Sequence, residues 1–400
     1  MNSVPFEELF LAPLRNGVSY PSARRGNGVP MINMGEAFRF DRITDQECER
    51  VPLTDRERRQ FLLGEGDLLF VRQSLKFEGA GKCIYVGVGR EPRTWESHLI
   101  RVRLDPDKAD SRYYYYYFRS PRGRLSIEAI IEQVAAAGVR GSDLRRLNVP
   151  YPCRGGQKRV ADALSAIDDK IAVNDRIAEK TRILARTQFR AAQESVGSGD
   201  IELASVVEFL NRGVAPRYTE DRSQLCVLNQ KCVRDGRVSL APSRRTLSDK
   251  VPSEKLLGVH DVLVNSTGMG TLGRVARWTG QGSCTVDSHV TIVRFDPAKI
   301  DPVCAGFAML DAEAEIESLG QGSTGQTELG RAQLSGLRIT VPSKEHAARL
   351  RPVLDALENR GDSALAESLS LVQLRDTLLP KLMSGEIRVR DAEKVVEEVT

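Results

Sequence analysis

The sequence lacks the residue patterns of metal sites and disulfide frameworks. It has only four histidines, none at metal-ligand spacing, and its seven cysteines are odd in number and include no CxxC pair. We therefore expect no metal site, no disulfide framework and reduced thiols, as in a cytoplasmic protein. No apolar run approaches the ~18 residues of a membrane-spanning helix. The start, MNSVPFEELF, lacks the basic and apolar segments of a signal peptide, so we expect no membrane contact.

A strong net charge is absent as well. The formal net charge is +4, so no basic field over the whole protein is predicted. Arginine outnumbers lysine by 45 to 13, and arginine is the side chain suited to paired contacts with phosphate and guanine. A GC-rich genome would give the same excess, so the bias leaves both interpretations open. With 400 residues and 41% apolar residues, the chain can form two domains, each with its own core.

What the sequence does contain is a long internal repeat. WESHLIRVRLDPDKAD (95–110) returns almost unchanged as VDSHVTIVRFDPAKID (286–301), with His98 and His289 separated by 191 residues. The match extends upstream to Asp67 and Asp261, 194 residues apart, and downstream to the prolines at 152 and 342, which are 190 residues apart. Solenoid repeats have periods of roughly 20–50 residues. The sequence therefore predicts two similar domains from a tandem duplication.

Each repeat has a mixed part followed by a long helical part. Strand-like runs such as DLLFV, KCIYVGV, HLIRVRL, DVLVN and VTIVRF are bounded by Gly, Asp and Pro. Apolar residues then recur every seven positions in 157–192 and again in 350–378, which predicts two helices paired as an antiparallel coiled coil. A 36-residue helix would be about 54 Å long. Pro352 and the stretch 360–362 predict a kink or break in the second helix.

Three segments carry a resemblance to a known family. They are GGQKRVADALSAIDDKIAVNDRIAEK (155–180), LRDTLLPKLMSGEIRV (374–389) and VLVNSTGMGTLGRVA (262–276). The chain resembles the specificity subunit of type I restriction-modification systems over nearly its whole length. The resemblance implies an α/β (α+β) fold of two similar target recognition domains joined by two long antiparallel helices. The expected segments are recognition domains at 1–155 and 197–342, spacer helices at 156–196 and 343–390, and a tail at 391–400.

The same resemblance implies a non-catalytic DNA-binding protein. Each recognition domain would read one half of a bipartite site in double-stranded DNA. The helices would dock two modification subunits, which carry the S-adenosylmethionine, and a translocating restriction subunit can join them. This chain would bind no cofactor itself. The alternative is a scaffold or regulatory adaptor that kept the helix pair for docking and lost DNA reading.

Candidate DNA contacts are the glycine-rich loop after the strand DVLVN, a second polar glycine-rich stretch, and basic residues around them. Glycines let backbone N–H groups approach phosphate, and Ser, Thr, Gln and Arg side chains reach phosphates or base edges. For each of these, an ordinary solvated loop remains the alternative. The predicted DNA-binding residues are Arg24, Arg25, Arg72, Lys76, Lys82, Lys231, Arg234, Arg244, Arg245, Ser266, Thr267, Gly268, Gly270, Arg274, Gln321, Ser323, Thr324 and Gln326.

The two helical segments supply the candidate docking residues. These are Asp168, Lys170, Asn174, Arg375 and Lys381, which fall in the segments that resemble the family's spacers. The tyrosine run 113–117 could stack on bases. Its counterpart in the second repeat is apolar, so we favour a buried helix. Asn148-Val149-Pro150-Tyr151 lacks the first proline of the amino-methyltransferase motif, and no nucleophile with a neighbouring base is evident, so we predict no catalytic site.

Overall fold

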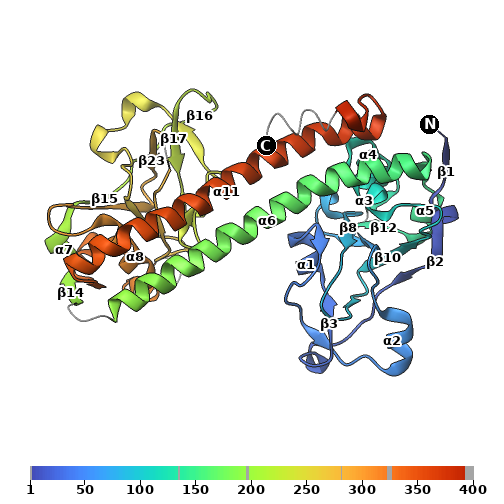
Figure 1. The fold of residues 1–400 in the computed structure, drawn as a ribbon, viewed down its shortest axis with the longest axis horizontal. Coiled ribbons are helices and arrows are strands. Elements are labelled where there is room, and N and C mark those ends of the chain that lie inside the picture. The colour runs from blue at the N-terminus through green and yellow to red at the C-terminus, as the bar shows by residue number, and fades with distance from the viewer. Residues whose placement is uncertain (1, 134–135, 195–197, 281, 322–326, 392–400) are drawn as a thin grey trace. The chain divides into compact units, whose positions relative to one another are not determined.

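The computed structural model describes residues 2–133, 136–194, 198–280, 282–321 and 327–391. The chain forms two compact units, one made of Met1–Val173 with Glu367–Thr400 and the other of Asn174–Ala366. The two long helices, α6 (Arg154–Gln193) and α11 (Lys344–Ser384), each begin in one unit and end in the other (Figure 1). The division predicted from sequence, with each helix as a segment of its own, stays a prediction.

Each unit is built on a sheet in which four antiparallel strands come in the same order, and in the first unit a short fifth strand is added in parallel at one edge. The repeated runs predicted as strands form these sheets: LLFV and VLVN are buried at every position, and all their residues but Asn265 are apolar. The first sheet runs β2 (Phe10–Asn16), β10 (Leu99–Leu104), β6 (Leu68–Val71), β8 (Cys83–Val86) and β4 (Arg42–Ile43). The second runs β15 (Val207–Arg212), β24 (Val290–Phe295), β21 (Val262–Asn265) and β22 (Val275–Arg277).

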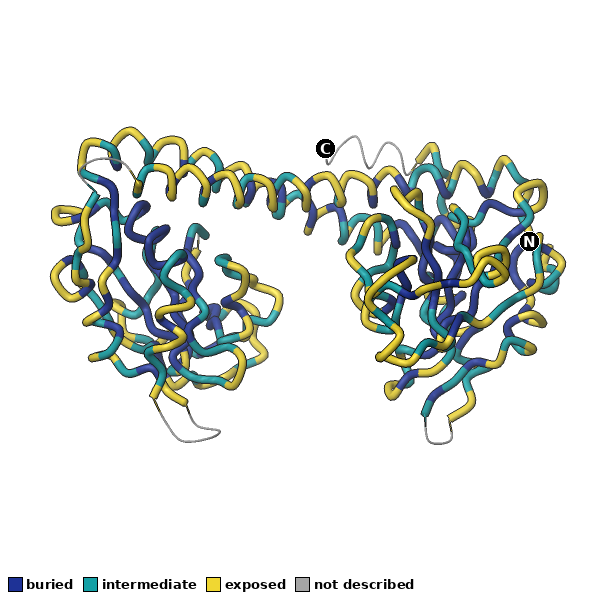
Figure 2. Tube along the Cα trace, turned by 90° about the horizontal axis from the view of Figure 1, so that it is seen from below, coloured by how far each residue is buried: buried dark blue, intermediate teal, exposed yellow. Residues whose placement is uncertain are grey.

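The smaller strands repeat as well. A parallel pair recurs as β3 (Val29–Ile32) with β9 (Thr94–Trp95) and as β17 (Leu225–Leu228) with β23 (Cys284–Val286). An antiparallel pair recurs as β1 (Ser3–Pro5) with β13 (Asn148–Pro150) and as β14 (Gly199–Glu202) with β25 (Arg338–Val341). The predicted internal duplication is therefore confirmed at the level of topology. Figure 2 shows the buried residues concentrated in the interior of each unit.

The remaining elements are short. The further helices are α1 (Met34–Arg39), α2 (Asp55–Phe61), α3 (Ser111–Arg119), α4 (Pro121–Glu128), α5 (Gly141–Arg146), α7 (Leu203–Val206), α8 (Pro302–Asp311), α9 (Glu313–Ser318) and α10 (Arg331–Ser335). The further strands are β5 (Arg50–Val51), β7 (Gln73–Ser74), β11 (Ile131–Gln133), β12 (Ala137–Val139), β16 (Tyr218–Thr219), β18 (Val233–Arg234), β19 (Arg237–Val238) and β20 (Arg244–Thr246). Among the described residues, no helix is long and apolar enough to cross a membrane.

An ion pair between a buried aspartate and a partly buried arginine occupies the same place in both sheets. Arg103 donates two hydrogen bonds of 2.7 Å to Asp67, and Arg294 donates two to Asp261, at 2.8 and 2.6 Å. Each carboxylate also accepts a backbone N–H from the turn before its strand, from Gly64 or from the glycine at 258. Both aspartates are buried, and because each is paired and hydrogen-bonded its burial is compensated. The duplication thus extends to polar contacts inside each core.

The tyrosine run lies in α3, and all five rings are buried, which confirms the predicted buried helix. The corresponding helix of the second unit, α8, is apolar and buried. Asp110 caps the N-terminus of α3 and Asp301 caps that of α8, each accepting a backbone N–H of the first turn. Asp105 and Asp296 directly follow β10 and β24, and each accepts a backbone N–H from two residues on, which forms a turn at the end of the strand.

Within each unit one half of α6 packs against one half of α11. In the first unit Leu164 and Ile167 share a core with Leu371 and Leu378. In the second unit the shared core includes Ala185, Phe189, Ala347 and Leu354. Early residues of α6 thus meet late residues of α11, and late residues meet early ones. The predicted antiparallel pair of helices, which pack through apolar residues that recur every seven positions, is confirmed.

The predicted break at 360–362 is wrong, because α11 is one continuous helix. Gly361 does not end the helix but lets neighbouring side chains pack closely against it. A Cβ at that position would lie only 2.6 Å from Arg237 Nη2 and 2.8 Å from Thr181 Oγ1. The next residue, Asp362, accepts a 2.5 Å hydrogen bond from Thr279. The sequence Arg-Gly-Asp is therefore a point of close contact within the second unit.

Candidate nucleic-acid interface

One loop in each unit follows the corresponding central strand. In the first unit this is the 72–82 loop, after β6, and in the second it is the 266–274 loop, after β21. Arg72 N–H donates to the His98 carbonyl and Ser266 N–H donates to the His289 carbonyl, both over 2.8 Å. The carbonyls of Arg72 and Ser266 in turn accept from residues 139 and 329, over 2.9 and 2.8 Å. Arg72 and Ser266 are therefore equivalent positions.

The two loops also end in the same way. Gly81 N–H donates to Val71 O over 2.8 Å, and Gly273 N–H donates to Asn265 O over 2.9 Å. Both glycines have positive φ, 72° and 77°, a backbone conformation that favours glycine. The residue after each is basic: Lys82 in the first unit and Arg274 in the second. Lys82 and Arg274, both predicted to contact DNA, therefore occupy one structural position.

Lys82 and Arg274 differ in what holds them. Lys82 Nζ lies 2.9 Å from an Asp41 carboxylate oxygen and donates to the Phe38 carbonyl. Burial would raise the pKa of Asp41, but Arg119 and Lys82 outweigh it and hold that pKa below its ordinary value. Within the described residues, the Arg274 guanidinium donates to the carbonyl of Gly270, 2.8 Å away in its own loop, and to no carboxylate. Its remaining donors can therefore turn to a phosphate with less competition than those of Lys82.

A polar cluster lies at the base of the 266–274 loop. Gln230 Nε2 donates to the carbonyl and the hydroxyl of Thr267, at 2.5 and 2.7 Å. The Thr267 hydroxyl shares a 2.8 Å hydrogen bond with His289 Nδ1. The backbone of Glu328 forms isolated antiparallel β-bridges with Thr267 and with Gln321. The Glu328 side chain forms an ion pair with Arg212. Exposed Lys231 follows Gln230 directly. Residues from five segments of the chain therefore meet at the base of this loop.

Ser266 does not fit the predicted DNA contact. Its side chain is fully buried, and its hydroxyl shares a 2.5 Å hydrogen bond with Thr291. Because strands β21 and β24 pair through this region, the hydroxyl faces the sheet. Ser266 is thus a structural residue; Thr267 and Gly268 are partly exposed, and the exposed residues of the loop begin at Met269.

The other predicted basic residues are distributed over several elements. Arg244 is exposed and stacks over Tyr218, with 3.5 Å from its guanidinium carbon to the ring centre. Others are tied to the protein: Arg25 to Glu49 and the Tyr20 carbonyl, Arg72 to the Ser97 carbonyl, Arg234 to Asp235, and Arg245 to the Gln224 carbonyl. Arg24 and Lys76 are exposed. Ser323, Thr324 and Gln326 lie outside the described residues.

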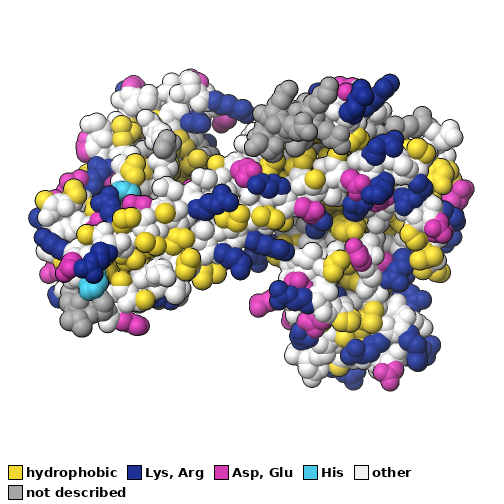
Figure 3. All heavy atoms as spheres, in the orientation of Figure 1, with side chains coloured by type: hydrophobic (Ala, Val, Ile, Leu, Met, Phe, Trp, Pro, Cys, Tyr) yellow, Lys and Arg dark blue, Asp and Glu magenta, His cyan; other side chains and the backbone are white. Residues whose placement is uncertain are grey.

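Basic and acidic side chains are interleaved on the face shown in Figure 3, and no single basic surface covers it. This agrees with the net charge of +4. Any affinity for DNA must therefore come from a few placed cations, because the protein as a whole supplies only a weak field. The equivalent loops are one place where a basic residue recurs in both units.

The predicted docking residues are less accessible than the sequence suggested. Arg375 donates a 2.8 Å hydrogen bond to Asp168, and the two side chains are only 14% and 9% exposed. Asn174 is fully buried. A direct contact of Asp168 or Asn174 with another subunit is therefore not available in this conformation. Lys170 is partly exposed beside Glu367, and Lys381 is partly exposed near the end of α11.

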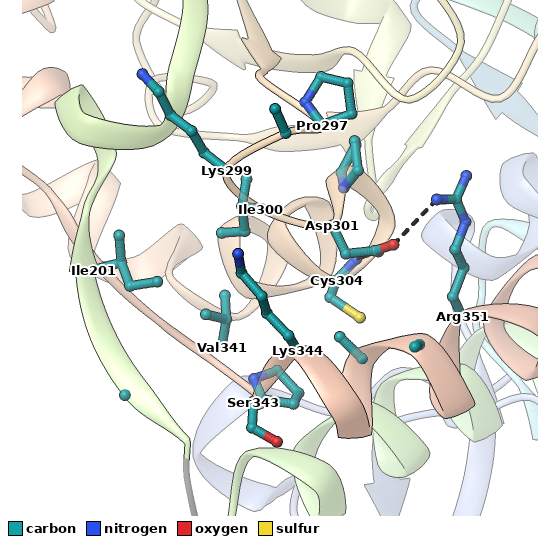
Figure 4. Close-up of a pocket in the computed structure, with 16 residues that line it drawn as sticks. Ile201, Pro297, Lys299, Ile300, Asp301, Cys304, Val341, Ser343, Lys344 and Arg351 are labelled. Atoms are coloured by element: carbon teal, nitrogen blue, oxygen red, sulfur yellow. Dashed lines mark hydrogen bonds and ion pairs between the residues drawn. The ribbon is translucent and has the colours of Figure 1, made fainter.

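The second unit also has a pocket between α8, the end of β25 and the start of α11 (Figure 4). Its volume is about 380 Å³, and Lys299, Lys344 and Arg351 line it, with Arg351 paired to Asp301. Burial raises the pKa of Cys304 in this pocket to about 12, so its thiol is a poor nucleophile. The pocket therefore offers no catalytic group of this kind. Among the described residues, no three of His, Cys, Asp or Glu could hold a metal ion.

Comparisons with known proteins bear on the fold. No protein-family model matches the sequence, and no curated protein matches it. Among solved structures, the S subunit of a type I restriction-modification system from M. genitalium superposes with a TM-score of 0.61 at 16% identity, over 95% of each chain. At this identity the match shows a shared fold.

Two further solved structures match with lower scores. The HsdS subunit from Thermoanaerobacter tengcongensis gives a TM-score of 0.36 at 13% identity, over 96% of this chain and 97% of that one. A chain from a structure on complex assembly and conformational transition of the type I R-M system gives 0.43 at 14% identity, over 96% and 98%.

Proposed function

Because the chain has the fold of a type I restriction-modification S subunit, we propose that it is the DNA-binding specificity subunit of such a system. In this proposal each unit reads one part of a bipartite duplex site. The chain carries out no catalysis and binds no cofactor of its own. Two modification subunits dock on α6 and α11, hold S-adenosylmethionine and methylate adenine. A restriction subunit joins where the system has one.

The observation that carries the proposal is the duplicated loop. The 72–82 and 266–274 loops are fixed to their sheets by equivalent backbone hydrogen bonds. Each ends in a glycine with positive φ followed by a basic residue. Phosphate contacts give affinity without sequence choice, and base contacts give the choice. The two loops share their backbone arrangement and the basic residue at their end, but differ in the sequence between. This combination suits a protein that reads two different half-sites.

The polar cluster of the second unit supports base reading there. Gln230, Thr267 and His289 are held in one hydrogen-bonded arrangement, with Gln321 joined to it through Glu328. Amide and hydroxyl side chains that are oriented before binding lose less entropy on contact with a base edge. The exposed Lys231 beside them can reach a phosphate.

The direct test is footprinting with the assembled methyltransferase. The modification subunits, with and without this chain, are incubated with genomic duplex fragments, and protected bases are mapped. We expect two protected tracts a fixed number of base pairs apart, only when the chain is present. Equal protection without the chain, or protection of every duplex alike, would contradict the proposal; the second result would indicate an adaptor without sequence reading.

A further inference from the structure

Two apolar side chains stand out at the surface of the equivalent loops. Leu75 is 96% exposed and Met269 is 92% exposed, while the next most exposed large apolar side chain in the described part of the chain, Val88, is 68% exposed. Leu75 is the third residue after Arg72, and Met269 is the third after Ser266. Since Arg72 and Ser266 are equivalent, the two most exposed apolar residues occupy the same place in the two units.

The loops present these side chains by different local means. Met269 lies between Gly268 and Gly270, both with positive φ, 106° and 72°. A Cβ at position 268 would meet Thr271 and Gln230 at 2.4 and 2.6 Å, so the close approach there requires glycine. Leu75 has no glycine neighbours and is followed by Lys76, whose N–H donates to Ser74 Oγ. Two loops of different sequence therefore hold an apolar side chain out into solvent.

Single exposed apolar residues are common and need no explanation by themselves. What argues for a role here is their recurrence at one position beside cations. Lys76 and Lys82 lie in the same loop as Leu75, while Arg274 lies in the loop of Met269 and Lys231 lies at the base of that loop. Cations that bind phosphate, next to a protruding Leu or Met, match the composition of proteins that insert an apolar wedge between base pairs.

We propose that Leu75 and Met269 are wedge residues, each inserted at a base step of its own half-site. The proposal rests on the function proposed above. Insertion removes a large apolar side chain from water and partly unstacks one step, which bends or opens the duplex there. Both residues are unbranched at Cβ and can adjust to the gap, and methionine is the more adaptable of the two.

The test uses the assembled methyltransferase on its bipartite duplex with 2-aminopurine placed in turn at each step. We expect the wild-type complex to raise 2-aminopurine fluorescence at one step in each half-site. Leu75→Ala should abolish the signal in one half-site only, Met269→Ala in the other only, and each should weaken binding about 5- to 100-fold. Met269→Leu should keep the signal, and Val88→Ala should behave as wild type.

The outcomes separate this inference from the proposed function. If wild-type complex binds the bipartite duplex but both alanine variants keep signal and affinity, the wedge proposal is wrong and the function stands. Loss of affinity without any 2-aminopurine signal in the wild type would also overturn insertion. If the wild-type complex does not bind a bipartite duplex at all, both proposals fail.

Discussion

Arg375 of α11 donates a hydrogen bond to Asp168 of α6 over 2.8 Å, although 207 residues separate them in the chain. The same carboxylate accepts from the Tyr116 hydroxyl of α3 over 2.7 Å. The buried Asp168 carboxylate thus links α6, α11 and α3. The first unit is thereby a single body made from both ends of the sequence.

Removing Arg375 should be costly. Arg375→Ala leaves the Asp168 carboxylate buried with one partner fewer, and breaking a buried pair on one side typically costs about 3–5 kcal/mol. Lys170 and Glu367, a more exposed pair on the same helices, provide the control, since exposed pairs contribute about 0–1 kcal/mol. Urea unfolding of Arg375→Ala and Lys170→Ala compares the two. Equal losses would contradict the structural role of the Asp168 pair.

Gln157 should stabilise the first unit more than its counterpart stabilises the second. Its amide accepts from Asp110 N–H over 2.8 Å and donates to the Pro152 carbonyl over 2.9 Å. The corresponding residue is Ala347, which lines the pocket of about 380 Å³. Gln157→Ala should lower the free energy of unfolding by about 1–3 kcal/mol, because buried backbone groups lose their partner.

The control for that change is the reverse substitution in the second unit. Ala347→Gln has room in the pocket, so we expect a change within about 1 kcal/mol by urea unfolding. A large loss from Ala347→Gln together with none from Gln157→Ala would contradict the equivalence of the two positions.

Asp41 should make the first unit sensitive to acid. Burial works against its ionisation, but Arg119 and Lys82 lower its pKa below the ordinary value in the folded state. The stability that its carboxylate contributes is present above the unfolded pKa of about 3.9 and is lost as pH falls through the lower folded pKa. The difference in unfolding free energy between wild type and Asp41→Asn should therefore be constant above about pH 5 and shrink below pH 4. A difference that stays constant down to pH 3 would count against this pairing.

Arg274 should contribute to DNA affinity through phosphate. Arg274→Ala in the assembled complex should weaken binding to specific and nonspecific duplexes alike and reduce the slope of log K against log salt by about 0.9. Arg338 in β25, which belongs to a different sheet, is the matched control, and Arg338→Ala should leave the slope unchanged. A variant that relaxes preference at one base without changing the slope would instead make Arg274 a base-reading residue.

Much of the fold was predictable because the duplication is visible in the sequence. Asp67 and Asp261 mark equivalent strands, and the 3.5-residue apolar period marks α6 and α11. The unbroken course of α11 was not predictable, since Gly361 lies in the helix for close contact with Thr181 and Arg237, which only the folded chain brings near.

The candidate site was predictable in part. The basic residues Lys82 and Arg274 were predicted from the glycine-containing stretches in which they lie, and the backbone hydrogen bonds of their loops give the residue-by-residue equivalence. The burial of Ser266 and the pairing of Asp168 depend on neighbouring strands and helices distant in sequence. Leu75 and Met269 could have been found, because both lie eight residues after the repeated aspartate, Asp67 or Asp261.

The most direct measurement is methylome sequencing of cells with and without this chain. Two different readers on one repeated scaffold should direct methylation to adenines in two dissimilar half-sites with a constant gap between them. Deleting the chain should erase that one motif, and restoring the wild-type chain should bring it back. An unchanged set of methylated motifs after deletion would contradict the account.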